Sequence, residues 1–261
     1  MKPPVAMTIA GVDSSGGAGV AADLAAFAAQ GVWGACAITA VTAQNSTSVD
    51  AVELLSLDVV VTQIEAVCSD MHVGAVKTGM LGSSRMIDAV AGALPFGIPL
   101  VVDPVMVATT GDALIDGECD YGALLAKATI VTPNAHETEV LTGIALDDED
   151  AIVRAARALL EFGCHAALVK GGHVGNGPAR DCLLLAGQPG PIWLEAERVA
   201  GDDTHGTGCV LSASIAAGLA HGDDITSACR RGKAAVTEAI RRRVKLGKGI
   251  AAANPTGLRS A

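Results

Sequence analysis

Short apolar runs alternate with longer segments of helical periodicity along most of the chain. The short runs are rich in β-branched residues and predict strands at 5–10, 35–41, 73–78, 98–102, 128–132 and 166–170. Helical spacing of the apolar residues predicts helices at 17–30, 57–70, 83–93, 148–162, 207–220 and 223–243, with shorter ones near 116–126 and 135–142. Such alternation is typical of a mainly parallel sheet covered on both faces, so we expect an α/β fold.

The remaining segments fit the same single unit. A more polar strand pattern occupies residues 181–199, on either side of turn residues at 187–191. Residues 24–49 carry no formal charge, but Gln30, Gly31 and Gln44 interrupt them, so we expect a buried helix and strand rather than a membrane span. With no repeat and no linker in the sequence, we expect one domain over residues 1–261.

Composition and charge narrow the classes of function. An apolar fraction of 50% excludes a disordered chain, and a formal net charge of −10 argues against a general nucleic-acid binder. The basic cluster between Arg230 and Arg243 is interpreted as the solvated face and last turn of a helix, with only Lys233 kept as a candidate nucleotide contact. Seven cysteines without a C-x-x-C pair, and no secretory signal, predict reduced thiols in a cytoplasmic protein.

The ends of the predicted strands carry the candidate chemistry, because ligands of parallel sheets bind beyond the carboxyl ends of the strands. The strands lead into Gly11 with its glycine-rich loop, Lys77 with Met80, Asp103, Asn134 and Lys170. The loop at 11–19 matches neither the dinucleotide fingerprint nor the phosphate loop of nucleotide hydrolases. The missing fingerprint also argues against a dehydrogenase.

The strongest local motif is Thr204-His205-Gly206-Thr207-Gly208-Cys209, which is followed by a helical run. Glycines at a helix start free backbone N–H groups to surround an anion, and such a hole stabilises the charge on a transferred phosphoryl group. The glycines alone equally fit an ordinary turn. Cys209 is either a buried apolar residue or, with a pKa depressed by the helix N-terminus, a thiolate that acts as a base.

Three further side chains are candidates for nucleotide and metal binding. Lys170 could reach a nucleotide phosphate or form a salt bridge at the sheet edge. Asp103 and Glu137 are candidate carboxylates around Mg²⁺, which prefers oxygen ligands and retains water. The six histidines show no metal-ligand spacing, and only His205 lies near the proposed chemistry.

Taken in order, these motifs resemble the hydroxymethylpyrimidine/phosphomethylpyrimidine kinases of the ribokinase-like superfamily. The resemblance runs from TIAGVDSSGGAGVAADL through ITAVTAQNS, VKTGML and VVDPVMVATTGDAL to TPNAHETEVL, VKGGH and THGTGCVLSASIAAGLA, with LGKGI as a weak last match. It thus covers essentially the whole chain. The TAQN segment and the GTGC end favour the pyrimidine kinases over the sugar kinases.

The resemblance implies a role for each motif. Asp23 and Gln44 would hydrogen-bond the aminopyrimidine, and Gly11, Thr42, Met80 and Val107 would surround its ring. The nucleotide would contact Lys170, Thr204, Thr207 and Gly208, while Gly206 to Cys209 would form the anion hole. Asn134 and Glu137 would hold Mg²⁺ with Asp103 nearby. Cys209 stands where most of the superfamily has an aspartate base, which fits the pyrimidine kinases but weakens the case for strong base catalysis.

The implied protein is a three-layer α/β/α kinase with a small β-flap around residues 12–18 and 42–55. It would use ATP and Mg²⁺ to phosphorylate 4-amino-5-hydroxymethyl-2-methylpyrimidine and then its monophosphate, in thiamine biosynthesis. A homodimer and a monovalent cation are further expectations from the family. Two alternatives stay open: a pyridoxal or pyridoxine kinase of the same superfamily, and a pyrimidine-binding sensor that has lost turnover.

Overall fold

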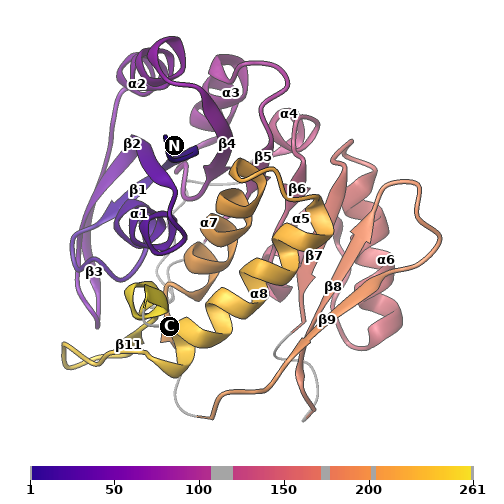
Figure 1. The fold of residues 1–261 in the computed structure, drawn as a ribbon. Helices are drawn as coiled ribbons and strands as arrows, with labels where there is room; N and C mark the ends of the chain where they lie inside the picture. The colour runs from indigo at the N-terminus through magenta and orange to yellow at the C-terminus, as the bar shows by residue number, and fades with distance from the viewer. Residues whose placement is uncertain (1, 107–119, 172–176, 201–203, 260–261) are drawn as a thin grey trace.

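A computed structural model describes residues 2–106, 120–171, 177–200 and 204–259 and shows a nine-stranded sheet between two layers of helices (Figure 1). The strand order is β3-β2-β1-β4-β5-β6-β7-β8-β9. The parallel strands are β1 (Val5–Asp13), β2 (Trp33–Gln44), β4 (Val73–Thr78), β5 (Leu100–Val102), β6 (Ile130–Val131) and β7 (Ala166–Lys170). At the edges, β3 (Val49–Leu54), β8 (Ala179–Leu185) and β9 (Ile192–Ala196) pair antiparallel to their neighbours.

Two apolar cores separate the sheet from the helices on its two faces. One core packs the sheet against α2 (Leu57–Asp70), α3 (Ser84–Ala93), α4 (Gly122–Leu125), α5 (Ala135–Thr142) and α6 (Glu149–Leu160). The other packs it against α1 (Gly19–Ala29), α7 (Thr207–Ala220) and α8 (Ile225–Arg241), which lie in front of the sheet in Figure 1. Within β5, Leu100 and Val102 face the first core and Val101 the second, as strand alternation requires.

The expected three-layer α/β/α class with a mainly parallel sheet is confirmed, and so is each long helix, to within a few residues at its ends. Two predicted strands are shorter than expected: 98–102 becomes β5 and 128–132 becomes β6. The first two strands are longer, because β1 continues to Asp13 and β2 to Gln44. Of the helix expected near 116–126, the described part is α4, and residues 116–119 lie outside the described residues.

The flap has a structural counterpart in the hairpin of β2 and β3. Its edge strand β3 lies within the flap range 42–55 that the resemblance implies, but the apolar pattern alone did not indicate it, because most of its side chains are exposed and its sequence VDAVEL shows no apolar run. A small second sheet pairs β10 (Thr204–His205) with β11 (Ala251–Ala252), ahead of the 3₁₀ helix η1 (Pro255–Arg259). These two-residue strands tie the C-terminal segment to the start of α7.

The helix that follows β6 begins with a complete capping box. The Asn134 side chain accepts a hydrogen bond from the Glu137 N–H at 2.9 Å, and the Glu137 carboxylate accepts one from the Asn134 N–H at 2.7 Å. Both side chains are thereby held at the carboxyl end of the sheet. No helix in the described residues is long and apolar enough to cross a membrane.

Candidate active site

The ends of β5 and β7 and the first turns of α5 and α7 bring together a lysine and two buried carboxylates. The Lys170 ammonium lies 3.3 Å from Asp103 Oδ1 and 3.8 Å from Glu137 Oε2. Asp103 and Glu137 are almost fully buried, whereas 18% of the Lys170 side chain is exposed. The structure thus gathers four of the residues named from the sequence, Lys170, Asp103, Glu137 and its capping partner Asn134.

Charge is unevenly balanced in this cluster. Burial raises the pKa of Glu137 to about 7, against the attraction of Lys170, and the Asp103 carboxylate adds to the rise. Burial alone would lower the pKa of Lys170, but Asp103 and Glu137 outweigh it, so the pKa is raised and the ammonium keeps its charge. A cation beside the two carboxylates would relieve this imbalance.

The glycine turn before α7 faces the same cluster. Gly206 has φ +80°, and a Cβ there would overlap the backbone carbonyl of Gly17, so this turn requires glycine. A Cβ at Gly208 would stand 3.5 Å from Lys170 Nζ and 3.6 Å from Asp103 Oδ2. The N-terminus of α7 therefore opens towards Lys170, with the bare backbone of Gly208 between them.

One turn into α7, Ser212 braces Asp103. Its hydroxyl lies 3.0 Å from Asp103 Oδ2 and 2.9 Å from the Gly208 carbonyl oxygen, and Thr132 lies 3.4 Å from the other carboxylate oxygen. Neither residue was singled out from the sequence. The only local signal for Thr132 is a hydroxyl next to the end of a strand. The only local signal for Ser212 is a hydroxyl about one helical turn beyond the glycine motif.

The expectation of a depressed pKa at Cys209 is wrong. Burial raises the pKa of the Cys209 thiol to about 11; Lys77 opposes the rise, and Asp23 and Asp103 add to it. The helix N-terminus does not compensate for two neighbouring carboxylates and the loss of water. Cys209 is thus a protonated thiol at neutral pH.

Asp23 lies deeper than its expected role suggests. Its carboxylate is fully buried and accepts hydrogen bonds from the Lys77 ammonium at 2.7 and 3.0 Å and from the Thr8 hydroxyl at 2.6 Å. Lys77 is equally buried, and attraction to Asp23 outweighs burial, so the pKa of Lys77 is raised. The structure shows Asp23 as the partner of Lys77 beneath the site, and its contact with a pyrimidine stays a prediction.

A buried hydrogen bond joins the loop after β1 to the glycine motif. His205 Nε2 lies 2.9 Å from Asp13 Oδ2, and Asp13 also accepts hydrogen bonds from the Ser15 N–H and hydroxyl and from the Ala18 N–H. Burial alone would raise the pKa of Asp13, but the hydrogen bonds from His205 and Ser15 outweigh it and lower the pKa. Sequence reasoning missed Asp13, whose only signal was its place within the glycine-rich loop.

The residues expected around the pyrimidine fall into two groups. Thr42 and Gln44 lie at the end of β2, where Gln44 Nε2 is 3.4 Å from His205 Nε2. Gly11 and Met80 adjoin each other, since a Cβ at Gly11 would stand 2.9 Å from Met80 Sδ. Val107 lies outside the described residues. Of the expected nucleotide contacts, Thr204 belongs to β10 and Thr207 begins α7, on either side of Gly206.

Comparison with known proteins places these motifs in one family. The family model for phosphomethylpyrimidine kinase matches residues 13–254. The chain belongs to this family. The hydroxymethylpyrimidine/phosphomethylpyrimidine kinase of Rhizobium meliloti is 46% identical over 94% of each chain, and that of Streptomyces coelicolor is 45% identical over 96% of this chain and 93% of its own.

Solved structures agree with the fold of this phosphomethylpyrimidine kinase family member. An ADP complex of pyridoxal kinase from Bacillus subtilis has a TM-score of 0.88 at 30% identity and covers 100% of both chains. The phosphomethylpyrimidine kinase from Clostridium difficile has a TM-score of 0.77 at 39% identity, over 91% of this chain and 99% of its own. The fold is therefore shared by pyrimidine and pyridoxal kinases.

The donor set of the phosphomethylpyrimidine kinase site fits a magnesium ion shared with other ligands. Asp103 and Glu137 supply buried carboxylate oxygens, as a hard cation requires. Within the described residues no group of three His, Cys, Asp or Glu side chains surrounds a common point. A Mg²⁺ ion at this place would therefore take most of its ligands from water and phosphate oxygens.

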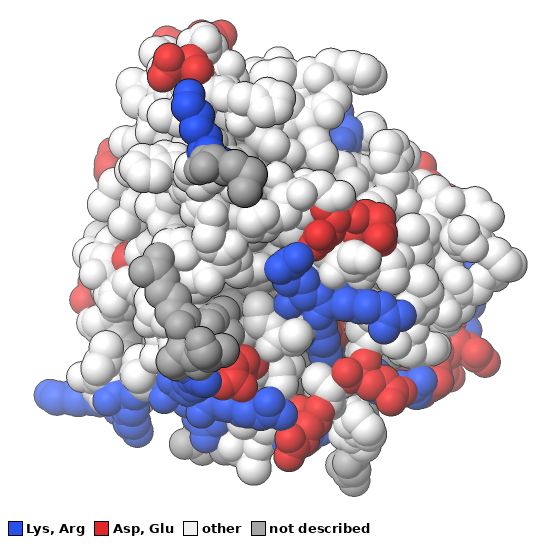
Figure 2. All heavy atoms as spheres, viewed as in Figure 1, with Lys and Arg blue, Asp and Glu red and all other residues white. Residues whose placement is uncertain are grey.

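The basic residues of α8 are mostly paired with carboxylates. Arg241 lies 2.8 Å from Glu197, and Arg231 lies 2.8 Å from Asp223. Figure 2 shows the Lys and Arg side chains in blue gathering at the lower edge, with Asp and Glu in red among them. Lys233 differs, because it is buried and lies 2.7 Å from Asp181, whose other oxygen accepts the Gly171 N–H at 3.2 Å. Lys233 thus supports Gly171, the residue after Lys170, through Asp181.

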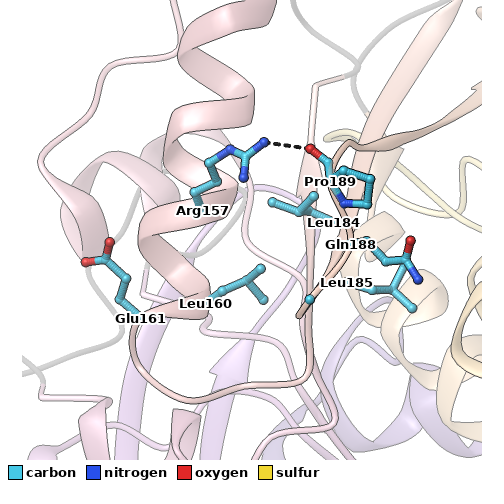
Figure 3. A pocket seen from close by; sticks show the side chains of 8 residues that line it. Arg157, Leu160, Glu161, Leu184, Leu185, Gln188 and Pro189 are labelled. Carbon is cyan, nitrogen blue, oxygen red and sulfur yellow. Dashed lines mark hydrogen bonds between the residues drawn. The ribbon is translucent and has the colours of Figure 1, made fainter.

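A separate open hollow of about 490 Å³ lies between α6 and the β8–β9 turn (Figure 3). Its lining includes Leu160, Leu184 and Arg157, and Arg157 donates a hydrogen bond to the Pro189 carbonyl oxygen at 3.0 Å. Because β8 runs antiparallel to β7, with Leu185 opposite Ala166, this hollow lies at the far end of β7 from Lys170. It takes no part in the candidate site.

Proposed function

We propose that this chain transfers the γ-phosphoryl group of ATP to the hydroxymethyl group of 4-amino-5-hydroxymethyl-2-methylpyrimidine and then to the resulting monophosphate, in thiamine biosynthesis. The observation that carries the proposal is the site of Lys170, Asp103, Glu137 and the α7 N-terminus in a chain that its family model matches over residues 13–254. Curated relatives at 37–46% identity carry the name of this two-step kinase.

The chain's residues suit the electrostatic demands of phosphoryl transfer. A loose transition state spreads negative charge over the transferred group and needs positioning and charge stabilisation more than a strong base. Backbone N–H groups of Gly206 to Cys209 and the α7 dipole would face that charge, and Lys170 would bind the nucleotide phosphates. Since the Cys209 thiol is protonated, it would contact the hydroxymethyl oxygen of the substrate rather than act as the base that removes the hydroxyl proton.

Mg²⁺ would be held by Asp103 and Glu137, with Asn134 fixing Glu137 through the capping box. When bound, the ion would neutralise charge on the nucleotide phosphates. A monovalent cation is a further expectation, tested by comparing turnover in potassium and tetramethylammonium salts. Thr204, Thr207 and Gly208 would line the nucleotide phosphates. The pyrimidine would contact Asp23, Gln44, Thr42, Gly11, Met80 and Val107.

We place the protein in the cytoplasm as a homodimer. The dimer would bury the apolar side chains exposed on the flap and the neighbouring helix, which include Val41, Val52, Leu54 and Val59. No nucleic acid or membrane partner is part of the proposal, and the partners are the pyrimidine, ATP and a second copy.

A pyridoxal kinase is the second candidate, because pyridoxal kinase structures share the fold at TM-scores up to 0.88. The test is ADP release with Mg²⁺–ATP and, separately, hydroxymethylpyrimidine and pyridoxal, for the wild type and Lys170→Ala. We expect at least tenfold higher kcat/KM for the pyrimidine, and a loss of about 10²-fold or more in Lys170→Ala. A higher kcat/KM for pyridoxal would make the protein a pyridoxal kinase. Pyrimidine binding without ADP release would support the alternative of a pyrimidine-binding sensor that has lost turnover.

A further inference from the structure

His205 lies between an acid and the side chain expected to recognise the pyrimidine. Its Nε2 atom is 2.9 Å from Asp13 Oδ2 and 3.4 Å from Gln44 Nε2. His205 and Asp13 are only 6% and 5% exposed. The loop after β1 covers the ring so closely that a Cβ at Gly17 would stand 2.7 Å from it. The imidazole is therefore held in place by its surroundings. Its hydrogen bonds follow from which neighbouring atoms are donors and which are acceptors.

The positions of the hydrogen atoms follow from the partners. An ionised carboxylate only accepts hydrogen bonds, so His205 Nε2 must carry the proton that Asp13 receives. The lowered pKa of Asp13 keeps that carboxylate ionised. An amide nitrogen also only donates, so Gln44 Nε2 beside His205 Nε2–H would set one donor against another. An amide oxygen in that place would instead be the second, weaker acceptor of the same proton, which Asp13 and Gln44 would share in a three-centre hydrogen bond.

The same mismatch occurs on the other side of the amide. The Thr42 hydroxyl has one proton, and it donates that proton to the Val12 carbonyl oxygen at 3.0 Å. Its lone pairs then face Gln44 Oε1 at 3.3 Å, which sets one acceptor against another. Turning the amide by half a rotation exchanges its nitrogen and oxygen, which have nearly the same shape, and corrects both contacts at once.

We propose that His205, held by Asp13, fixes the Gln44 carboxamide with its oxygen towards His205 and its nitrogen towards Thr42, and that this orientation selects the aminopyrimidine edge. His205 and Asp13 are thus positioning residues for substrate recognition. The inference deepens the proposed function and rests on it, because it requires Gln44 to read the pyrimidine.

The fixed amide has one N–H and one oxygen lone pair left for the substrate, in a set order. The amino group and adjacent ring nitrogen of the substrate offer a donor and an acceptor, which would match this order with the amino group at the amide oxygen and the ring nitrogen at the amide N–H. A 4-oxo analogue that carries a proton on the ring nitrogen offers an acceptor and a donor in reverse order. A fixed amide rejects that analogue, whereas an amide free to turn accepts both, because a mismatched buried pair leaves polar groups unsatisfied.

The test is the ratio of kcat/KM for the 4-amino substrate to kcat/KM for the 4-oxo analogue. We expect the wild type to favour the amino compound by about 10³-fold or more. His205→Leu removes the donor and should lower the ratio at least tenfold, while His205→Gln, whose amide can still donate to Asp13, should restore most of it. His221→Leu, at the far end of α7, is the matched control and should keep the wild-type ratio.

A ratio unchanged in His205→Leu would overturn the positioning role, even if both kcat/KM values fell together. If the wild type itself does not phosphorylate the amino compound, the proposed function fails, and this inference fails with it. ¹⁵N spectra of the imidazole in the wild type give a second test that does not depend on turnover, with His205→Gln identifying the signal. A protonated Nε2 at His205 is expected, and a bare Nε2 would overturn the proposal.

Discussion

At the scale of single residues, the free energy of the site depends on which buried charges have partners. Asp103 receives hydrogen bonds from Ser212 and Lys170, whereas Glu137 shares Lys170 at the longer distance of 3.8 Å. Glu137 also accepts the Asn134 N–H at 2.7 Å, but burial still raises its pKa to about 7. Its ionisation is therefore sensitive to pH and to added cation.

Glu137 predicts a pH-dependent stability in the protein without Mg²⁺. Because burial raises its pKa from 4.5 to about 7, the folded state holds a proton that the unfolded state has lost between these values. The free energy of unfolding should thus fall as pH rises from about 4.5 to 7, by on the order of 2–3 kcal/mol from this group, and level off above. Denaturant unfolding at pH 5, 6, 7 and 8 measures this.

The matched variant is Glu137→Gln, which keeps the shape of the capping side chain but has no charge. Its stability should lack the fall attributed to Glu137, and Mg²⁺ at pH 8 should stabilise the wild type more than the variant. An identical pH dependence in the two proteins would contradict the charge balance described for the site.

Cys209 gives a second prediction at this scale. With a thiol pKa of about 11, only about one molecule in 10⁴ carries a thiolate at pH 7, so the thiolate makes little contribution as a base. Cys209→Ala and Cys209→Ser should each keep kcat within about tenfold of the wild type, since a positioned general base contributes 10² or more. A loss of 10³-fold in both variants, with unchanged folding, would restore the thiolate base.

Among the elements, the turn into α7 depends on glycine for two separate reasons. Gly206 has a left-handed φ of +80°, and the Gly17 carbonyl occupies the place of its missing side chain. Gly222 also has a left-handed φ, +91°, but it has open space around it. Comparing substitutions at the two glycines therefore distinguishes the effect of backbone strain, which both would share, from the effect of a clash with the loop after β1, which only Gly206 would have.

Gly206→Ala should therefore destabilise the protein by at least about 2 kcal/mol and abolish most of the kinase activity, because it displaces the glycine turn that begins the anion hole. Gly222→Ala should cost about 1 kcal/mol through strain and leave kcat unchanged. Thermal unfolding and ADP release on both variants test this. Equal stability and activity in the two variants would show that the contact between Gly206 and the β1 loop is unimportant.

How well each element can be predicted from the sequence follows from its burial. α7 is buried along almost its whole length and β7 is buried at four of its five residues, so their apolar patterns are clear. β3 is an exposed edge strand, and β10 and β11 have two residues each, so backbone pairing rather than apolar spacing defines them. Ends such as Asp13 and Gln44 were missed because the strands continue into polar residues.

The whole molecule brings together residues that lie far apart in the chain. Lys170, Asp103 and the glycine motif were identifiable because each follows a buried strand or starts a helix. The pairs Asp23–Lys77 and Asp13–His205 could not be found in this way. They join positions 54 and 192 residues apart, and no local pattern encodes such partners.

The exposed apolar edge of the molecule predicts its assembly. Val52 on β3 and Val59 on α2 are 40% and 49% exposed, which is unfavourable for an isolated chain. Sedimentation should show a dimer, and Val52→Lys should shift it towards the monomer, while Lys245→Glu near the C-terminal end should not. A wild type that sediments as a monomer at tens of micromolar would exclude the homodimer.

The second phosphorylation tests the central claim most directly, because its substrate carries a phosphate in place of the free hydroxyl group that the first phosphorylation uses. Hydroxymethylpyrimidine monophosphate is incubated with the protein, ATP and Mg²⁺, and the products are followed by ³¹P NMR. We predict the coupled signals of a pyrimidine pyrophosphate, formed in step with ADP and lost in Lys170→Ala. An unchanged monophosphate, in a preparation that phosphorylates pyridoxal, would contradict the account.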